Sequence, residues 1–212
     1  ILIEKNQSKR RKLNMKILGI GNAIVDVICK VDDEFIKKNN LTKSTMKLIF
    51  DENEFQQLLS NLKIEKTVSG GSVANSIVGL SQLGNDVGFI GKVNDDNLGG
   101  KYEEGLKTEN VKYFYSKKKE DLPTGTCLIL VTPDSERTMC TFLGTAGKIN
   151  ENDVDANAVK KSEIIFLEGY LWDEGDPKKA FDKAINNANK VAMSLSDQFC
   201  VDRHKPHFLE LV

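Results

Sequence analysis

The residues in this sequence that most suggest chemistry are two adjacent glycines directly before a helical pattern. Gly70 and Gly71 precede an apolar run with helical spacing, Ser72 to Leu83, and Asn75 lies in its first turn. Glycine lets a ligand approach the backbone closely, and the first turn of a helix leaves N–H groups unpaired. Such a segment can offer backbone donors and one amide to a polyol or an anion. By itself, the pattern describes a simple turn followed by an exposed asparagine equally well.

A carboxylate near the first expected strand could reach the same ligand. The strand is predicted over Lys16 to Gly21, and Asp26 follows it within a second apolar segment, Ile24 to Val31. An ionised carboxylate can accept hydrogen bonds from two neighbouring hydroxyl groups, which suits a sugar. If strand alternation turns its side chain away, Asp26 is instead a solvated residue of the sheet. The residues alone leave both interpretations open.

The composition argues against several classes of partner. The chain has 212 residues, of which 40% are apolar and 29% charged, and its formal net charge is -1. Binding to nucleic acid or to an acidic membrane surface needs a broad basic field, which this balance does not supply. No apolar stretch approaches the roughly 18 residues that a membrane helix needs. The four cysteines lie far apart among apolar residues, as reduced thiols do. We therefore expect a cytoplasmic protein with a small-molecule ligand.

The first fourteen residues differ in character from the rest of the chain. Residues 1–14 are polar and basic, with consecutive cations over Lys9 to Lys12, whereas a clean strand pattern begins at Met15. A solvated tail is the simpler interpretation of such a basic run. We expect residues 1–14 to be an upstream tail, the native start to be Met15, and residues 15–212 to form one folding unit or most of one.

The order of the expected elements indicates a layered α/β fold. Strands are predicted over Lys16–Gly21, Val87–Val93, Ile164–Leu167 and Val191–Leu195, and helices over Glu52–Leu62, Ser72–Leu83, Leu98–Thr108 and Pro177–Ala188. This alternation is typical of parallel strands joined by helical crossovers, with helices on both faces of the sheet. Asp51 and Asp176 are placed to begin helices, and Gly84 is placed to end one.

Four further segments do not fit that series and predict a second, smaller sheet. They are rich in β-branched residues and cover Val25–Val31, Thr45–Phe50, Thr126–Thr132 and Thr138–Leu143. The last two are separated by Pro133, Asp134 and Ser135, a typical hairpin turn. We expect these strands to form a small β-lid over the ligand site.

One familiar cofactor motif is incomplete. Gly19 and Gly21 begin a pattern similar to the dinucleotide-binding GxGxxG, but Ile24 stands where the last glycine is needed. A strand rather than a helix is expected to follow, so pyrophosphate binding at a helix start is not supported. A dehydrogenase is therefore disfavoured.

The C-terminal part offers two weaker candidates. Cys200, His204 and His207 lie close in sequence, but three ligands do not complete a tetrahedral zinc site, and we predict no metal. Trp172 and Tyr170 could stack on a nucleobase, although packing in the core or at a pocket rim is at least as good an interpretation.

Taken together, the motifs strongly resemble the first signature of the PfkB (ribokinase-like) family of carbohydrate and nucleoside kinases. The resemblance rests on Gly70–Ile77, Gly84 and Val87–Gly99. Upstream, Gly21-Asn22 with Asp26 four residues beyond Asn22 is more similar to the adenosine kinase branch.

The resemblance extends over most of the chain. It continues through Thr124–Thr126, Pro133–Met139 and Leu167–Tyr170, and so covers about Met15 to Val212. Two positions depart from the family pattern: Asn94 replaces a usual glycine, and Val73 stands where many members have a small residue. These departures affect the path expected for one loop and the shape expected for the pocket.

The resemblance implies a ribokinase-like layered sheet with a β-lid, and it implies which residues bind the substrate. Asp26, Gly70, Gly71 and Asn75 would hold sugar hydroxyls. The remaining pocket residues would be Asn22, Ser72 and Glu168. A carboxylate, an amide and open backbone groups can orient a polyol so that one hydroxymethyl group faces a phosphate donor.

The resemblance also implies an activity: transfer of a phosphoryl group from ATP, with Mg2+, to a hydroxymethyl group of a nucleoside or sugar, with adenosine favoured. Family members carry a later Asp-Thr-x-Gly-Ala-Gly-Asp segment that supplies the anion hole and the base. We expect that segment beyond Val212, so that 15–212 is the N-terminal portion of the kinase, the C-terminal part is missing, and no catalytic residue lies in this chain. Lid strands that pair between subunits in some members would provide a homodimer.

Two alternatives stay open beside adenosine phosphorylation. A ribose or fructose-type sugar kinase is compatible with the same residues, because they address hydroxyl groups rather than a base. A non-catalytic nucleoside- or sugar-binding protein needs the same pocket but no phosphate donor.

Overall fold

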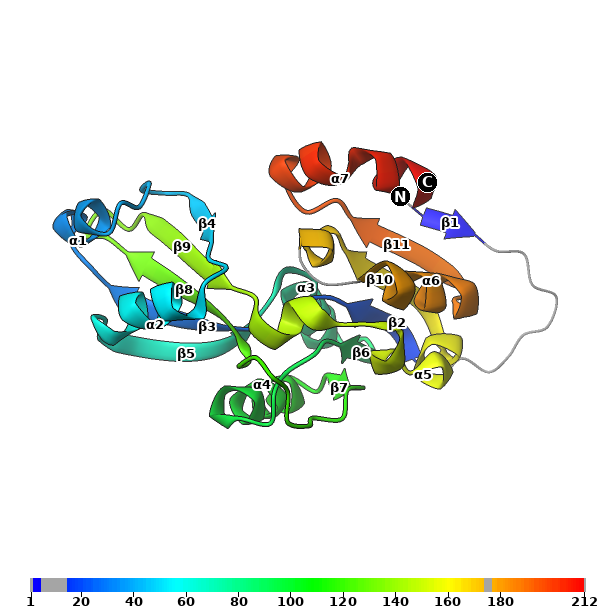
Figure 1. Ribbon diagram of the computed structural model, residues 1–212. Helices are drawn as coiled ribbons and strands as arrows, with labels where there is room; N and C mark the ends of the chain where they lie inside the picture. Colours follow the sequence, from blue (N-terminus) through cyan, green and yellow to red (C-terminus); the bar gives the residue numbers. More distant parts are fainter. Residues whose placement is uncertain (1, 5–14, 174–176, 212) are drawn as a thin grey trace.

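The computed structural model describes residues 2–4, 15–173 and 177–211, whose strands form two sheets lying beside each other (Figure 1). The strands are β1 (Leu2–Glu4), β2 (Met15–Ile20), β3 (Ile24–Lys30), β4 (Met46–Leu48), β5 (Ile64–Gly70), β6 (Val87–Ile90), β7 (Lys112–Tyr113), β8 (Gly125–Val131), β9 (Arg137–Phe142), β10 (Ser162–Glu168) and β11 (Lys190–Ser194). The α-helices are α1 (Asp33–Lys38), α2 (Glu52–Ser60), α3 (Ser72–Gln82), α4 (Asn97–Thr108), α5 (Ala156–Lys161), α6 (Pro177–Asn187) and α7 (Gln198–Leu211).

The first sheet, called here the main sheet, has the strand order β1-β11-β10-β2-β6-β7. All neighbouring strands are parallel except β1, which runs antiparallel to β11. Ile17 of β2 pairs with Ile164 on one side and with Val87 on the other. The predicted parallel sheet with helical crossovers is therefore confirmed.

Side-chain alternation along β2 explains why helices cover both faces of the main sheet. Leu18 and Ile20 are fully buried in a cluster with Val159 of α5 and Phe181 of α6. Gly19 points to the opposite face, where a Cβ atom would lie 2.8 Å from Cγ1 of Val73 in α3. The absence of a side chain at position 19 thus gives α3 room to pack closely on the strand.

The second sheet, called here the lid sheet, has the order β4-β9-β8-β3-β5 and mixes parallel with antiparallel pairs. One face packs against α1 and α2, where the rings of Phe55 and Phe142 lie 5.5 Å apart. The hairpin predicted between β8 and β9 is present: Ser135 has a φ of 67°, and the N–H of Thr132 donates to the carbonyl of Glu136 (3.0 Å).

Several elements, among them β5 and α1, have too weak a sequence signal to be predicted. Strand β5 lies at the edge of the lid sheet, with Ile64 half exposed, so its residues lack a clear apolar face. Helix α1 has six residues, too few for a periodic pattern. Its start is nevertheless fixed by Asp32, whose side chain accepts from the N–H of Phe35 (2.7 Å).

The helix ends agree with the expected capping residues where they are described. Asp51 accepts from the N–H of Glu54 (2.9 Å) at the start of α2. Gly84 adopts a φ of 85° just after α3, a left-handed conformation that suits glycine. Asp176, expected to begin α6, lies outside the described residues, as does the basic run of the N-terminal tail. Part of that tail, Leu2–Glu4, forms β1.

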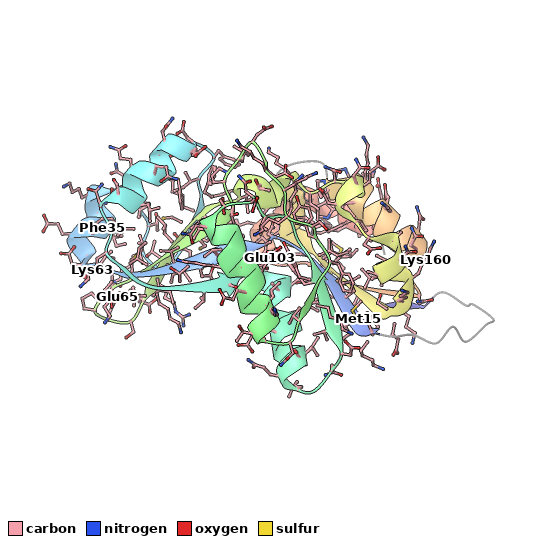
Figure 2. All side chains as sticks on the ribbon, turned by 90° about the horizontal axis from the view of Figure 1, so that it is seen from below. Met15, Phe35, Lys63, Glu65, Glu103 and Lys160 are labelled. Atoms are coloured by element: carbon pink, nitrogen blue, oxygen red, sulfur yellow. The ribbon has the colours of Figure 1, made fainter. Side chains whose placement is uncertain are left out.

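The two sheets extend in different directions from the point where β2 leads into β3. Figure 2 shows Lys63 and Glu65 at the outer end of the lid sheet and Met15 in the opposite part of the molecule, with α4 and its Glu103 between them. None of the helices in the described ranges is long and apolar enough to cross a membrane. The junction between the sheets is the position at which chain segments from both can surround a ligand.

Candidate functional site

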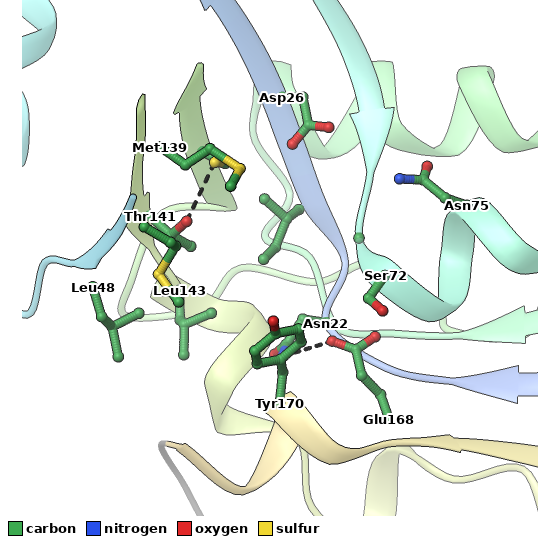
Figure 3. A pocket seen from close by; sticks show the side chains of 14 residues that line it. Asn22, Asp26, Leu48, Ser72, Asn75, Met139, Thr141, Leu143, Glu168 and Tyr170 are labelled. Atoms are coloured by element: carbon green, nitrogen blue, oxygen red, sulfur yellow. Dashed lines mark hydrogen bonds between the residues drawn. The ribbon is translucent and has the colours of Figure 1, made fainter. Parts of the chain in front are cut away.

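A pocket lies at the junction of the two sheets, lined by the strand ends of the main sheet, the start of α3 and one face of the lid sheet (Figure 3). Every residue that the sequence predicted for substrate binding lines it except Gly70: Asn22, Asp26, Gly71, Ser72, Asn75 and Glu168. Tertiary structure thus brings together residues from three separate segments of the chain, around positions 22–26, 71–75 and 168.

Asp26 and the twin glycines meet where β3 pairs with β5. Asp26 lies opposite Val68 in this antiparallel pair, and a Cβ atom at Gly70 would lie 2.4 Å from Oδ2 of Asp26. Gly71 has a φ of 105°, and a Cβ there would lie 2.3 Å from the backbone oxygen of Asn22. Gly70 therefore lies beside the pocket as a neighbour of Asp26, and Gly71 lets α3 begin next to Asn22.

Alternation along β3 directs Asp26 to the pocket side of the lid sheet. Its neighbours Val25 and Val27 are buried in the cluster that includes α2, so Asp26 faces the other way. Partial burial raises the pKa of Asp26 from 3.8 to about 6, and no hydrogen bond or ion pair from the described residues offsets this shift. The side chain is a partly desolvated carboxylate whose acceptor sites are available to a ligand.

Glu168, at the end of β10, is the most deeply buried charged group of the pocket, with 1% of its surface exposed. Asn22 Nδ2 donates to its Oε1 (3.1 Å), and the N–H of Val73 donates to its Oε2 (3.1 Å). Burial raises the pKa of Glu168 to about 7, although hydrogen bonds from the backbone of Val73 and from the side chain and backbone of Asn22 favour the ionised form. The carboxylate links β10, the turn after β2 and the first turn of α3.

Only one end of the Asn22 side-chain amide has a hydrogen-bond partner among the described residues. Its Nδ2 group donates to Glu168, but its Oδ1 atom is buried without a hydrogen-bond partner in the described parts of the chain. A buried acceptor without a donor costs about 1–3 kcal/mol. A ligand hydroxyl in the pocket would satisfy this oxygen.

Ser72 and Asn75 lie in the first turn of α3 and line the pocket. In Figure 3 the amide of Asn75 points toward the space beside Asp26, and Ser72 lies between Asn75 and Glu168. Asn75 is thus an exposed helical asparagine and a pocket residue at the same time.

The lid sheet contributes an apolar wall that the sequence analysis did not identify. This wall consists of Ile24, Met46, Leu48, Cys127, Met139 and Leu143. The available signal was strand alternation: in β9, Cys140 and Phe142 pack in the lid core, so Met139 and Thr141 must face the other side. Which face would meet the ligand depended on the sheet pairing.

Of the two aromatic candidates, only Tyr170 lies at the pocket. Its hydroxyl donates to Asp197 (2.9 Å), and its N–H donates to Oγ of Ser196 (2.9 Å). Trp172 instead packs edge-on against Phe181, with ring centroids 5.4 Å apart, and stacks on His207 at 5.5 Å. The prediction that Trp172 could stack on a nucleobase is therefore wrong, and the alternative of core packing is correct.

The candidate zinc ligands near the C-terminus do not face one another as a coordination site. Cys200 is buried, and His207 lies on the ring of Trp172. Within the described ranges, no group of three or more His, Cys, Asp or Glu side chains is arranged to hold a metal ion.

The charges of the pocket have one sign. Among the described residues that line it there is no Lys, Arg or His, and its two carboxylic acids are Asp26 and Glu168. Such a lining attracts hydroxyl and N–H donors and disfavours anionic ligands.

The structure accommodates both departures from the family pattern. Asn94 donates through Nδ2 to the carbonyls of Glu120 (3.2 Å) and Leu122 (2.9 Å), and its Oδ1 accepts from the N–H of Glu120 (2.9 Å). The amide therefore fixes the segment that leads into β8. Val73 fits because Gly19 opposite has no side chain.

Comparison with known proteins places this geometry in a family. The family model described as pfkB family carbohydrate kinase matches residues 18–211. The solved adenosine kinase from Sinorhizobium meliloti is 37% identical, with a TM-score of 0.85, over 93% of this chain and 61% of that one.

The curated relatives are named as kinases of different acceptor substrates. The 5-dehydro-2-deoxygluconokinase of Mesomycoplasma hyopneumoniae (strain 7448) is 26% identical over 69% of this chain and 45% of its own length. The guanosine-inosine kinase of Escherichia coli (strain K12) is 25% identical over 94% of this chain and 49% of its own. The chain spans less than half the length of these relatives. Its fold is ribokinase-like, and the chain belongs to the PfkB family of carbohydrate kinases.

Proposed function

We propose that this chain is the acceptor-binding part of an ATP-dependent kinase that phosphorylates a hydroxymethyl group of a nucleoside, with adenosine as the leading candidate. The observation that carries the proposal is the division of one pocket into a polar floor and an apolar wall. A nucleoside has the same division, because its ribose carries hydroxyl groups and its base is a flat, largely apolar ring.

The polar floor suits the ribose. Asp26 has free acceptor positions for two adjacent hydroxyls, and Asn75 and Ser72 can add donors and acceptors from the start of α3. Oδ1 of Asn22 supplies a further buried acceptor. Gly70 and Gly71 contribute by leaving space beside Asp26 and Asn22. Fixed in this way, a sugar presents its hydroxymethyl group in one direction.

The apolar wall suits the base. Leu48, Met139 and Leu143 come from the lid side, and Tyr170 comes from the main-sheet side. A planar ring between aliphatic or thioether groups and an aromatic face gains apolar burial and stacking together. Ribose or fructose alone would leave this wall uncovered, so the wall favours a nucleoside.

The negative lining supports a neutral acceptor. A phosphate or carboxylate on the ligand would approach Asp26 and Glu168 without any cation among the described lining residues to offset the repulsion. For the same reason, the pocket does not suit the triphosphate of ATP. We assign ATP and Mg2+, which supply the phosphoryl group and neutralise its charge, to a separate part of the kinase.

Ligand-induced thermal shift of the chain tests the acceptor. Adenosine is expected to raise the melting temperature more than ribose or fructose does at equal concentration, because a ligand that binds only the folded state stabilises it. Asp26→Asn, which keeps the shape and removes the charge, is the matched control and should abolish most of the shift. Equal shifts with adenosine and ribose would instead support a sugar kinase.

Turnover separates the kinase from a non-catalytic binder. Phosphoryl transfer depends on positioning and charge stabilisation, and the base and anion hole are expected outside residues 1–212. We expect no ATP-dependent phosphorylation of adenosine by the purified 212-residue chain above a mock preparation. Phosphorylation of adenosine by a longer protein that includes the residues encoded after Val212 would support the kinase. The Asp26→Asn variant of that protein should lose this activity.

The lid sheet also bears on the proposed homodimer. Met46 and Met139 on the pocket face of this sheet are 38% and 37% exposed, and Phe50 beside it is 68% exposed. Burial of these side chains against a second copy is a route to a dimer. A concentration-dependent mass in light scattering, lost in Phe50→Ser, would support that assembly.

A further inference from the structure

The relationship between Glu168 and Asn22 defines a role for Glu168 different from direct substrate binding. Both side chains are 1% exposed, and they come from distant positions in the chain, the end of β10 and the turn after β2. Asn22 Nδ2 donates to Oε1 of Glu168, and Figure 3 shows this contact at the base of the pocket.

Each carboxylate oxygen of Glu168 already has a donor from the protein. Oε1 accepts from Asn22, and Oε2 accepts from the N–H of Val73 in the first turn of α3. A Cβ atom at Gly21 would lie 2.2 Å from Oε2 of Glu168, so the absence of a side chain at position 21 leaves room for this carboxylate. The arrangement holds Glu168 in one position between two protein partners.

The contact with Glu168 also decides which end of the Asn22 amide is left for the ligand. Above its raised pKa of about 7, Glu168 is ionised and can only accept, so it must face the Nδ2 group of Asn22. The amide therefore keeps Oδ1 as its free end, and this oxygen is buried without a partner in the described part of the molecule. The pocket thereby gains an acceptor of fixed orientation.

We propose that Glu168 is a positioning residue that acts through Asn22: it orients the Asn22 amide so that Oδ1 accepts a hydroxyl of the acceptor substrate, and it does not itself contact that substrate. The inference rests on the proposed function, because it concerns the same pocket and a polyhydroxyl ligand. It assigns hydroxyl recognition at this point to an amide oxygen rather than to the carboxylate.

Glu168→Gln is the informative substitution because it keeps the size of the side chain and replaces one acceptor oxygen by an NH2 donor. To keep the bond from Val73, the introduced glutamine must turn its oxygen toward that N–H and its NH2 group toward Asn22. Asn22 must then rotate so that Oδ1 faces the glutamine and Nδ2 faces the pocket. The pocket loses its acceptor, and we expect adenosine to bind roughly tenfold more weakly.

A double-mutant cycle with Asn22→Ala tests the dependence on Asn22. In the Asn22→Ala background no amide remains to be oriented, so E168Q should change adenosine affinity less than about twofold by calorimetry. The smaller effect in this background is the non-additivity expected of two coupled neighbours. An equally large loss in both backgrounds would show direct contact by Glu168 and overturn the proposal. Glu163→Gln, on the same strand but in a surface ion pair with Lys16, is the matched control and should leave affinity unchanged.

A measurement without ligand separates failure of this inference from failure of the proposed function. The side-chain NH2 protons of Asn22 in 15N-edited NMR should exchange slowly in the parent chain and in E163Q, and should shift in E168Q. Glu168→Asp, whose shorter carboxylate cannot reach both partners, should shift them as well. Unchanged Asn22 signals in both Glu168 variants would refute the positioning role, whereas absence of adenosine binding with shifted signals would refute only the proposed acceptor.

Discussion

The carboxylate of Asp26 lies directly beside the backbone of Gly70, in the space that a side chain at position 70 would occupy. A Cβ atom on Gly70 would lie 2.4 Å from Oδ2, 2.5 Å from Cγ and 2.6 Å from Oδ1 of Asp26. This contact explains why a glycine is needed next to the pocket although Gly70 does not line it. It also joins the two sequence motifs on which the functional proposal depends.

Gly70→Ala should displace the carboxylate of Asp26 and weaken adenosine binding. The added methyl group cannot fit without movement of Asp26 or β5, so we expect a loss of stability of about 1–3 kcal/mol, as for other overpacked sites. Urea unfolding and calorimetric titration measure the two effects.

Gly79→Ala is the matched control for that substitution. Gly79 lies within α3, and nothing in the described structure lies within 4 Å of the position of its Cβ. Alanine there should stabilise the chain by up to about 1 kcal/mol, because it favours the helix, and should leave binding unchanged. Equal behaviour of the two variants would contradict the contact between Gly70 and Asp26.

Asp26→Asn should weaken adenosine binding but stabilise the folded chain. Burial without a compensating partner among the described residues raises the pKa of Asp26 to about 6, so the ionised form is unfavourable in the folded state. The neutral isostere should therefore raise the melting temperature near pH 8 while weakening adenosine binding at least about tenfold. A variant that loses both stability and binding would indicate that Asp26 is structural.

The stability of the chain should fall as the pH rises from about 4 to about 7. Burial raises the pKa of Asp26 from 3.8 to about 6 and that of Glu168 from 4.5 to about 7, so the folded state holds more protons than the unfolded state in this window. The free energy of unfolding then decreases with increasing pH. Urea unfolding at several pH values measures this contribution. The free energy of unfolding of Asp26→Asn should depend less steeply on pH than that of the parent chain.

Adenosine affinity should have the opposite pH dependence. An ionised Asp26 accepts hydroxyl hydrogen bonds at both oxygens, whereas the protonated form carries an O–H donor on one of them. Binding should therefore weaken as the pH falls through about 6, the pKa to which burial raises Asp26. Calorimetric titration at about pH 5 and about pH 8 tests this expectation, and an affinity that stays constant would exclude Asp26 as a hydroxyl acceptor.

Anionic acceptors should bind more weakly than their neutral counterparts. The described lining of the pocket contains two carboxylic acids and no cationic side chain, so a phosphate group meets only repulsion. We expect AMP to bind more weakly than adenosine and ribose 5-phosphate more weakly than ribose, with the difference largest at low salt. Tighter binding of the phosphorylated compounds would point to a sugar-phosphate kinase.

Much of the main sheet could be predicted from the sequence because its signals are local. The strand over 16–21 and the helix over 72–83 show the apolar spacing of β2 and α3, and Asp51 and Gly84 have the chemistry of helix ends. Strand β5 and helix α1 were not predictable in this way. The first is a half-exposed edge strand, and the second is shorter than two helical turns.

The sequence by itself determined the family, the alternation of strands and helices, and the set of polar residues from Asn22 to Glu168 that now line the pocket. These follow from residue type and spacing along the chain. Only the tertiary structure decided that Asp26 faces the pocket rather than bulk solvent, that Tyr170 rather than Trp172 borders it, and that Glu168 has Asn22 and Val73 as partners. Those outcomes depend on which strands pair and which faces are covered. Pairing joins residues more than 90 positions apart, and no local pattern encodes such contacts.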